Sequence, residues 1–130
     1  MNTYQIVRTE HLNHFKKLFG GYMLLWVDEF AWLTASRDFP GCSLVTRSMD
    51  KIDFTCPVES GSILRFNIMP ESTGNTSVVY SVNVFADAPG AEDEKLVFTN
   101  KVTFVNVDKS GKTVPLPEKL RPLRSELTNC

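Results

Sequence analysis

Two adjacent acids, Asp28 and Glu29, interrupt the most apolar stretch of the chain, residues 18–33. Burying an unpaired carboxylate costs several kcal/mol or raises its pKa. We therefore expect a functional Asp28 with a raised pKa, acting at a carbonyl carbon as a general base or nucleophile. The alternative is a structural ion pair of Asp28 with Arg37 or Lys51. Glu29 points about 100° away around a helix and is interpreted as a structural or interface acid.

A glycine pair, Gly20-Gly21, stands eight residues before this acid. If a helix begins there, its first backbone N–H groups lack partners and the helix dipole favours negative charge. The pair is therefore a candidate oxyanion hole, with Gly21 as the favoured donor. The alternative is that the glycines only permit close packing of a loop. Neither a Walker nor a dinucleotide-binding fingerprint follows them.

The segment before the glycines carries Asn13 between two histidines, His11 and His14. Asn13 can both donate and accept hydrogen bonds, so it suits a polar site as well as a loop turn. A histidine base is a possible alternative chemistry. However, no serine or cysteine elbow completes a triad, and further zinc ligands at suitable spacing are missing. We expect one histidine at the site entrance and the other in solvent.

A long helix has to position these groups. We predict that it runs from Gly20-Gly21 to about Arg37 and ends at residues 38–41, which contain Pro40 and Gly41. One side would carry Leu24, Leu25, Asp28, Ala31, Trp32 and Ala35. The other would carry Tyr22, Met23, Trp26, Phe30 and Leu33. A helix that is apolar on both sides must be covered twice, which predicts a partner subunit.

The remaining sequence alternates with period two, as strands do. The predicted strands are residues 4–7, 43–54, 62–69, 76–86 and 96–107. Short turns at residues 71–75 and a polar loop at 87–94 make the later strands antiparallel. The sequence therefore predicts an α+β fold in which one long central helix is wrapped by a curved antiparallel sheet of about five strands. An extended or partly disordered tail follows from Thr113.

The composition sets wider limits. A chain of 130 residues fits one domain, taken as residues 1–115, with a tail at 116–130. The net charge of -1 does not favour binding to nucleic acid or to an anionic membrane. Three cysteines, Cys42, Cys56 and Cys130, form no disulfide or zinc pattern and suit a reducing compartment. The beginning of the sequence has no signal-peptide pattern, so we expect a cytoplasmic protein. The two acids argue against membrane insertion of residues 18–33.

Three segments together resemble the hotdog-fold acyl-CoA thioesterases of the cytosolic acyl-CoA hydrolase type. They are the Asn-to-Gly-Gly loop at residues 12–21, the hydrophobic–Asp-Glu helix motif at 25–29, and the strand at 45–54 with Pro57, Val58 and Gly61 beyond it. Residues 74–78 and 104–108 are weaker echoes. One departure is Lys16, where many family members have glycine, and it affects the expected substrate choice more than the reaction type.

The resemblance implies hydrolysis of acyl-CoA to a free acid and coenzyme A, without a metal or redox cofactor. It implies that Asn13 of one subunit works with Asp28 of the other, in a homodimer at minimum and possibly a tetramer or hexamer. The residues expected at the substrate, besides Asp28, Asn13 and Gly21, are Gly20, Thr46, Arg47, Thr76, Ser77 and Lys112. Thr46 would support the carbonyl site, and the last four are candidates for contacts with coenzyme A.

Alternatives from other functional classes remain. A non-catalytic acyl-CoA-binding module on the same fold would not need both Asn13 and Asp28. A hotdog hydratase or dehydratase would need a histidine–carboxylate pair in the pocket, and an assembly protein would leave Asp28 unexplained. Trp26, Phe30 and Leu33 are candidates for an acyl tunnel, although core packing is the favoured interpretation.

Overall fold

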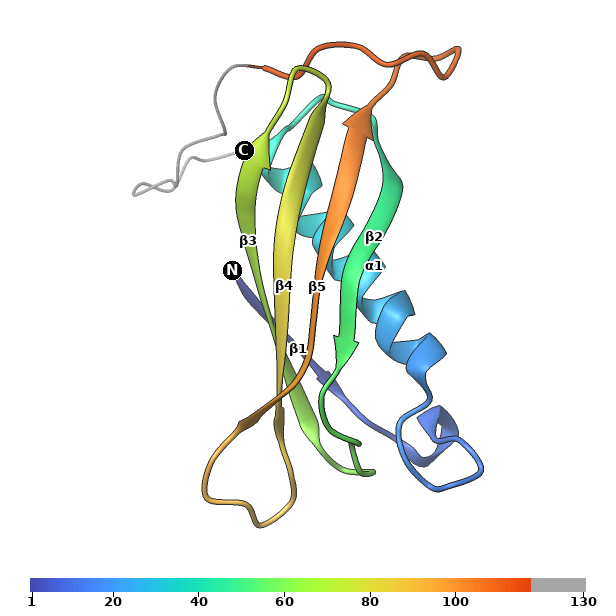
Figure 1. The fold of residues 1–130 in the computed structure, drawn as a ribbon, viewed down its shortest axis with the longest axis vertical. Coiled ribbons are helices and arrows are strands. Elements are labelled where there is room, and N and C mark those ends of the chain that lie inside the picture. Colours follow the sequence, from blue (N-terminus) through green and yellow to red (C-terminus); the bar gives the residue numbers. More distant parts are fainter. Residues whose placement is uncertain (118–130) are drawn as a thin grey trace, which may run out of the picture.

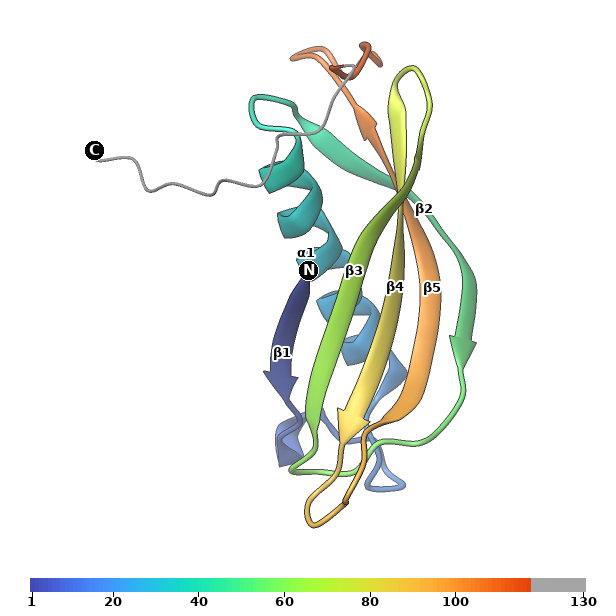
Figure 2. The ribbon, with the colours of Figure 1, turned by 90° about the vertical axis from the view of Figure 1, so that its left-hand side faces the viewer.

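A single helix lies across the concave face of a five-stranded antiparallel sheet (Figures 1 and 2). The structure is a computed structural model and describes residues 1–117. Its elements are β1 (Asn2–Ile6), a 3-10 turn (Thr9–His11), α1 (Gly20–Asp38), β2 (Leu44–Phe54), β3 (Ile63–Thr73), β4 (Ser77–Asp87) and β5 (Lys95–Asn106). The predicted α+β architecture, with one long helix and five strands, is confirmed.

The strands are ordered β1-β3-β4-β5-β2, and every neighbouring pair is antiparallel. β3, β4 and β5 form consecutive hairpins, whereas β2 precedes them in sequence and forms the edge beside β5. The predicted turn at residues 71–75 is misplaced, because β3 continues to Thr73 through an irregularity between Pro70 and Ser72. A bulge absorbs the proline there, since proline cannot donate to a regular ladder.

The predicted limits of α1 are confirmed to within one residue. The helix begins at Gly20, after Phe19, and its glycines stand at the end where they weaken a helix least. It ends at Asp38, and the Phe39 N–H closes the last turn by donating to Ala35 O at 2.9 Å. Pro40 cannot extend the helix further.

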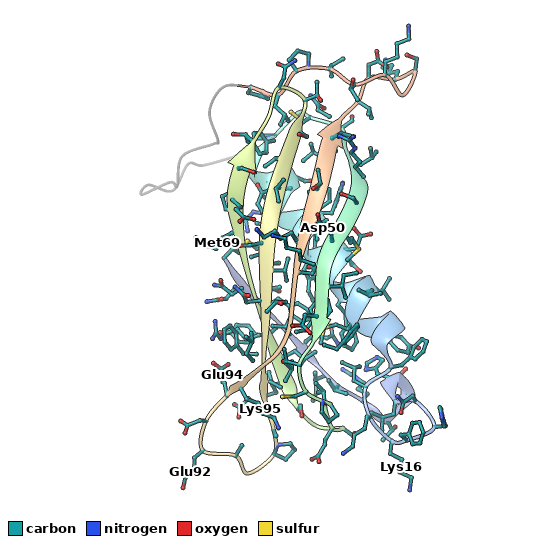
Figure 3. All side chains as sticks on the ribbon, in the orientation of Figure 1. Lys16, Asp50, Met69, Glu92, Glu94 and Lys95 are labelled. Carbon is teal, nitrogen blue, oxygen red and sulfur yellow. The ribbon has the colours of Figure 1, made fainter. Side chains whose placement is uncertain are left out.

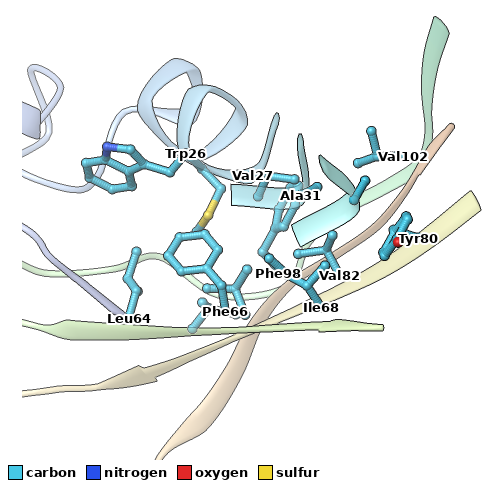
Figure 4. Close-up of a cluster of buried hydrophobic side chains, with 14 of the residues drawn as sticks. Trp26, Val27, Ala31, Leu64, Phe66, Ile68, Tyr80, Val82, Phe98 and Val102 are labelled. Carbon is cyan, nitrogen blue, oxygen red and sulfur yellow. The ribbon is translucent and has the colours of Figure 1, made fainter. Parts of the chain in front are cut away.

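The core lies between α1 and the inner face of the sheet. In Figure 4, Val27 and Ala31 of α1 lie over Phe66 and Ile68 of β3, with Val82 of β4 beside them. The buried residues of the helix are Met23, Trp26, Val27, Ala31, Thr34 and Ala35. The predicted division of the helix surface was therefore wrong, because Met23 and Trp26 share the buried side with Ala31 and Ala35.

The opposite side of α1 is uncovered in the single chain. Leu25, Trp32 and Leu33 are exposed there, each by between 42% and 54%. The edge strand β2 is likewise exposed along most of its length. The Trp32 indole N–H donates to Leu44 O at 2.8 Å, which fixes the helix to the start of β2. The prediction of a partner subunit rests on this apolar side of α1.

The chain after β5 returns along the end of the sheet. The N–H of Val114 donates to Asn106 O, and that of Leu116 donates to Asn75 O. Leu116 packs against the core. The predicted tail at 116–130 therefore begins as an attached segment, and its residues 118–130 lie outside the described part. Within residues 1–117, no helix is both long and apolar enough to cross a membrane.

Candidate active site

A cavity of about 490 Å³ opens where α1 begins, between the loop that precedes the helix and the adjacent ends of β2 and β5. Its lining consists of Asn13, Phe15, Lys17, Leu18, Gly20, Met23, Phe54, Thr55, Cys56, Pro57, Val58 and Val97. Its size falls within the range of roughly 300–1,000 Å³ that is typical of small-molecule sites. Two residues predicted from sequence, Asn13 and Gly20, therefore face the same cavity.

Asn13 organises the loop in front of the helix. Its side-chain oxygen accepts hydrogen bonds from the N–H groups of Phe15 and Lys17, at 2.9 and 3.2 Å. Its own N–H donates to Lys17 O at 2.7 Å. The alternative interpretation, that Asn13 stabilises a loop turn, is therefore correct for its side-chain oxygen. Because that oxygen is occupied, the amide NH₂ is the part of the side chain left for a ligand, and it can only donate.

The tip of this loop contains a backbone conformation that is uncommon for lysine. Lys16, labelled at the edge of the molecule in Figure 3, has a φ of 62°. Side chains with a Cβ visit this left-handed region at a cost, and glycine does so freely. This geometry explains why a glycine would suit the position, and it shows that Lys16 keeps the turn while pointing its side chain outward.

The first turn of α1 leaves backbone donors free. Tyr22 and Met23 both donate to Phe19 O, so the N–H groups of Gly20 and Gly21 precede the first helical hydrogen bonds. A Cβ on Gly21 would lie 2.5 Å from the Phe19 ring, and one on Gly20 would lie 3.3 Å from the Phe54 ring. The glycines thus do permit close packing. Gly20 faces the cavity, and Gly21 as oxyanion donor stays a prediction.

Asp28 lies further along α1 and does not line the cavity. It is partly exposed, not buried as its apolar sequence context predicted. Its Oδ1 accepts a 2.6 Å hydrogen bond from Thr46 Oγ1 of β2. Within residues 1–117 it forms no ion pair with Arg37 or Lys51, so that alternative is wrong for the single chain.

The other predicted site residues fall into separate groups. Glu29 and Arg47 are exposed, and Arg47 follows Thr46 on β2. Thr76 lies in the β3–β4 turn, Ser77 is the first residue of β4, and Lys112 follows β5. Figure 1 shows both segments at the opposite end of the sheet from the loop that carries Asn13. A single chain therefore brings together Asn13 with Gly20 and Asp28 with Thr46, but does not unite the two pairs.

The two histidines have different surroundings. His11 Nδ1 accepts from Arg8 N–H at 3.0 Å, and its ring lies 4.8 Å from those of Tyr22 and Trp26. His14 is exposed beside Phe15. His11 thus joins the loop to α1, which makes it a packing residue, and the expectation of a solvated histidine is met by His14.

Of the residues that line the cavity, sequence reasoning named only Asn13 and Gly20 as site residues. Met23, Phe54 and Cys56 all line it, although they come from α1, from the end of β2 and from the segment after β2. The alternation of β2 shows only that Phe54 closes a strand. No pattern in the sequence indicates which helix turn meets it, so these contacts depend on the tertiary packing.

Comparisons with known proteins find a matching family profile and several similar curated proteins. A profile described as Thioesterase superfamily matches residues 15–92, more than half of the chain. A Bacillus subtilis protein, uncharacterized acyl-CoA thioester hydrolase YkhA, is 29% identical over 115 residues, which are 88% of this chain and 66% of that protein. The chain spans no more than about two thirds of the length of the first curated relatives that it matches.

Solved structures agree with this match. An acyl-CoA hydrolase from Bacillus cereus is 31% identical, with a TM-score of 0.84 and coverage of 95% of this chain and 74% of that one. An acyl-CoA hydrolase from Staphylococcus aureus, solved with butyryl coenzyme A, coenzyme A and coenzyme A disulfide, is 30% identical, with a TM-score of 0.81 and coverage of 90% and 71%. Hexameric thioesterases share the fold.

Single alanine variants of the Staphylococcus aureus hydrolase have also been solved, at an asparagine, an aspartate and a threonine. That asparagine and aspartate are fifteen positions apart, the same separation as Asn13 and Asp28 in this chain.

Proposed function

Since this chain belongs to the thioesterase superfamily and has its hotdog fold, we propose that it hydrolyses an acyl-CoA thioester to a carboxylic acid and coenzyme A. The observation that carries the proposal is the orientation of Asn13. Two backbone N–H groups hold its oxygen, so its NH₂ is the part left to donate, and Asn13 lines the same cavity as Gly20 at the positive end of α1. Donors at a helix N-terminus suit the oxyanion that forms from a thioester carbonyl.

Asp28 acts as the general base in this proposal. The bond from Thr46 engages only its Oδ1, which leaves Oδ2 for the attacking water. The carboxylate takes the water proton while the water oxygen bonds to the carbonyl carbon. The C–S bond then breaks, and the Asp28 carboxyl returns that proton to the departing sulfur of coenzyme A, which leaves the carboxylic acid and regenerates the carboxylate. The reaction needs no metal or redox group, and coenzyme A enters only as part of the substrate.

The two halves of this site come from different subunits. Asp28 lies on α1 next to the exposed residues Leu25, Trp32 and Leu33, whose apolar surface favours a second copy of the chain. Covering that surface would bring Asp28 of one subunit toward the Asn13 loop of the other. The smallest active unit is therefore a homodimer, and the hexamers among the structural neighbours support assembly beyond it.

Residues outside the cavity have a role in holding coenzyme A. Arg47 and Lys112 offer positive charge for its phosphates, and Thr76 with Ser77 offers hydroxyl groups at the start of a strand. The β3–β4 turn lies at the opposite end of the sheet from the loop that precedes α1 in its own chain (Figure 1). Thr76, Ser77 and Lys112 would therefore contact coenzyme A that is bound to a neighbouring subunit.

The test is release of free thiol from a panel of acyl-CoA esters by the purified full chain. Asn13→Asp is the sharpest variant, because its oxygen can still accept from Phe15 and Lys17 while the donors are lost. We expect kcat/KM to fall by roughly 10²–10³, the usual effect of one oxyanion donor, with an unchanged unfolding midpoint. Asp28→Asn should abolish turnover. A wild-type chain without thiol release, or a fully active Asn13→Asp variant, contradicts the proposal.

A further inference from the structure

The lining of the cavity at the start of α1 changes from exposed to buried with depth. Phe15 and Phe54 at the rim are 72% and 50% exposed. Met23, Val58 and Val97 are 1%, 4% and 1% exposed and form the inner wall. The half-buried groups Asn13 and Gly20 lie between these two levels. A carbonyl held by them therefore has an apolar wall on one side and an open rim on the other.

We propose that the inner part of this cavity is the acyl subsite, that Met23 and Val97 limit the length of the acyl group, and that coenzyme A stays at the rim. This inference rests on the proposed hydrolysis and goes beyond it, because it names the kind of acyl group. The group is uncharged and of short or medium length.

The charge distribution supports an uncharged acyl group. All three residues of the inner wall are hydrocarbon or thioether side chains, which offer nothing to an anion or a cation. The charged residue of the cavity, Lys17, lies toward the surface and pairs with Glu59 at 3.3 Å. If the acyl group ended in a carboxylate, this carboxylate would lie against the inner wall without water and without a positively charged partner.

The volume supports a limited length. A cavity of about 150 Å³ binds benzene, so the 490 Å³ found here corresponds to roughly three groups of that size. Part of this space must hold the thioester and the nearest atoms of the thiol arm. Hexanoyl to decanoyl groups fit what remains, whereas a palmitoyl chain would extend beyond the inner wall.

The rim of the cavity beside the reacting group is held in place. The Phe54 ring packs edge-on against Phe98, with centroids 4.8 Å apart, and lies close to Gly20. Met23 is the adaptable member of the lining, since its unbranched thioether fills irregular spaces. A shorter side chain at Met23 lengthens the cavity without changing the donors at Asn13 and Gly20. Met23 is therefore the residue at which length preference can be altered.

The first experiment measures kcat/KM for acetyl-, hexanoyl-, decanoyl- and palmitoyl-CoA. The wild-type chain should prefer hexanoyl to decanoyl groups. Met23→Val should raise the decanoyl-to-hexanoyl ratio by roughly tenfold, the scale of one methylene in an apolar pocket. The volume-matched control Met23→Leu should leave the ratio within about twofold. A wild-type preference for palmitoyl-CoA, or an unchanged ratio in a folded Met23→Val variant, overturns the inference.

The second experiment needs no variant and no turnover, because Cys56 lines the cavity and Cys42 does not. Alkylation of each thiol by iodoacetamide is followed by mass spectrometry. S-decyl-CoA, a thioether without a scissile carbonyl, should slow alkylation of Cys56 severalfold and leave Cys42 unaffected, and coenzyme A alone should protect Cys56 much less.

The two experiments separate the two claims. Protection of Cys56 by S-decyl-CoA in a chain that hydrolyses no ester would refute the proposed function and retain the subsite. Turnover without any protection would refute the subsite alone.

Discussion

Thr46 of the edge strand β2 donates a 2.6 Å hydrogen bond to the Asp28 carboxylate of α1. A bond of this length between a hydroxyl and a carboxylate is charge-assisted and directional. It fixes one oxygen of Asp28 and thereby sets the direction of the other. In the proposed mechanism this makes Thr46 a positioning residue that acts through Asp28, and its direct support of the carbonyl stays a prediction.

Replacing Thr46 by valine keeps its shape and removes the hydroxyl. We expect Thr46→Val to lower kcat by up to about 10²-fold, since misplacement of a catalytic group by about 1 Å has that effect. KM should change little. Thr46→Ser should restore most of the rate because it returns the hydroxyl, and a thiol-release assay measures all three chains. Equal rates for valine and serine variants would show that the bond has no catalytic role.

The separation of Asn13 from Asp28 in the single chain predicts complementation between defective subunits. Asn13→Ala and Asp28→Asn chains should each be nearly inactive alone. In a mixture that re-forms dimers at random, half of the dimers are mixed, and each mixed dimer has one site with both residues intact. Thiol release should then return to about a quarter of the wild-type rate. A mixture that stays inactive would place both residues of each site within one chain.

A further polar contact joins the C-terminal end of α1 to the sheet. Tyr80 of β4 is fully buried, and its hydroxyl donates to Asp38 Oδ2 at 2.7 Å. Burial, and then the hydrogen bond to Asp38, raises the pKa of Tyr80 well above its usual value. The last residue of the helix is thereby held against the middle strand.

Tyr80→Phe removes this bond and leaves the Asp38 carboxylate without its donor. We expect the free energy of unfolding to fall by about 1–3 kcal/mol, measured in urea near neutral pH. The raised pKa also predicts the pH dependence of the wild-type chain. Above the ordinary tyrosine pKa of about 10, the unfolded chain loses the proton first, so this stabilisation is complete below that pH and is lost as the pH rises.

The phenylalanine variant should lack that alkaline decrease, which makes it a control for other groups that titrate there. If both chains lose stability equally above a pH of about 10, the Tyr80 hydroxyl is not the group responsible.

Local patterns were sufficient to predict the elements of the fold. The glycine pair and Pro40 mark the two ends of α1, and period-two alternation marks the strands, because these signals act within a few residues. The turn after β3 was misplaced because Ser72 is a common turn residue, yet pairing with β4 extends β3 across a bulge. Tertiary pairing there overrides local preference.

The site depends more on contacts between distant segments. Apolar residues surround α1 on all sides in sequence, so no pattern shows that Trp26 is buried and that Leu25 and Trp32 are exposed. The same ambiguity made Asp28 look buried. The role of Asn13 in a polar loop was predictable from its type, but the meeting of Met23 with Phe54 and Cys56 was not, because it follows from how the helix crosses the sheet.

Within residues 1–117, two side chains, Ser36 and Asn100, have buried polar atoms without a hydrogen-bond partner, and in Asn100 both polar atoms lack one. Asn100 of β5 is 3% exposed, faces the core between Phe98 and Val102, and neither its Nδ2 nor its Oδ1 has a hydrogen-bond partner. It lies beside the irregularity of β2 between Asp50 and Asp53. A buried amide without partners lowers stability.

Asn100→Leu replaces this amide by an apolar group of similar size. We expect the free energy of unfolding to rise by about 1–3 kcal/mol, the cost of an unsatisfied buried group. Asn100→Ala is the control, because it removes the amide but leaves a cavity and should gain less. The free energy of unfolding in urea is measured for the wild-type chain and for the Asn100→Leu and Asn100→Ala variants. A less stable leucine variant would mean that water satisfies the amide at the β2 irregularity, and the loss would then measure that buried water.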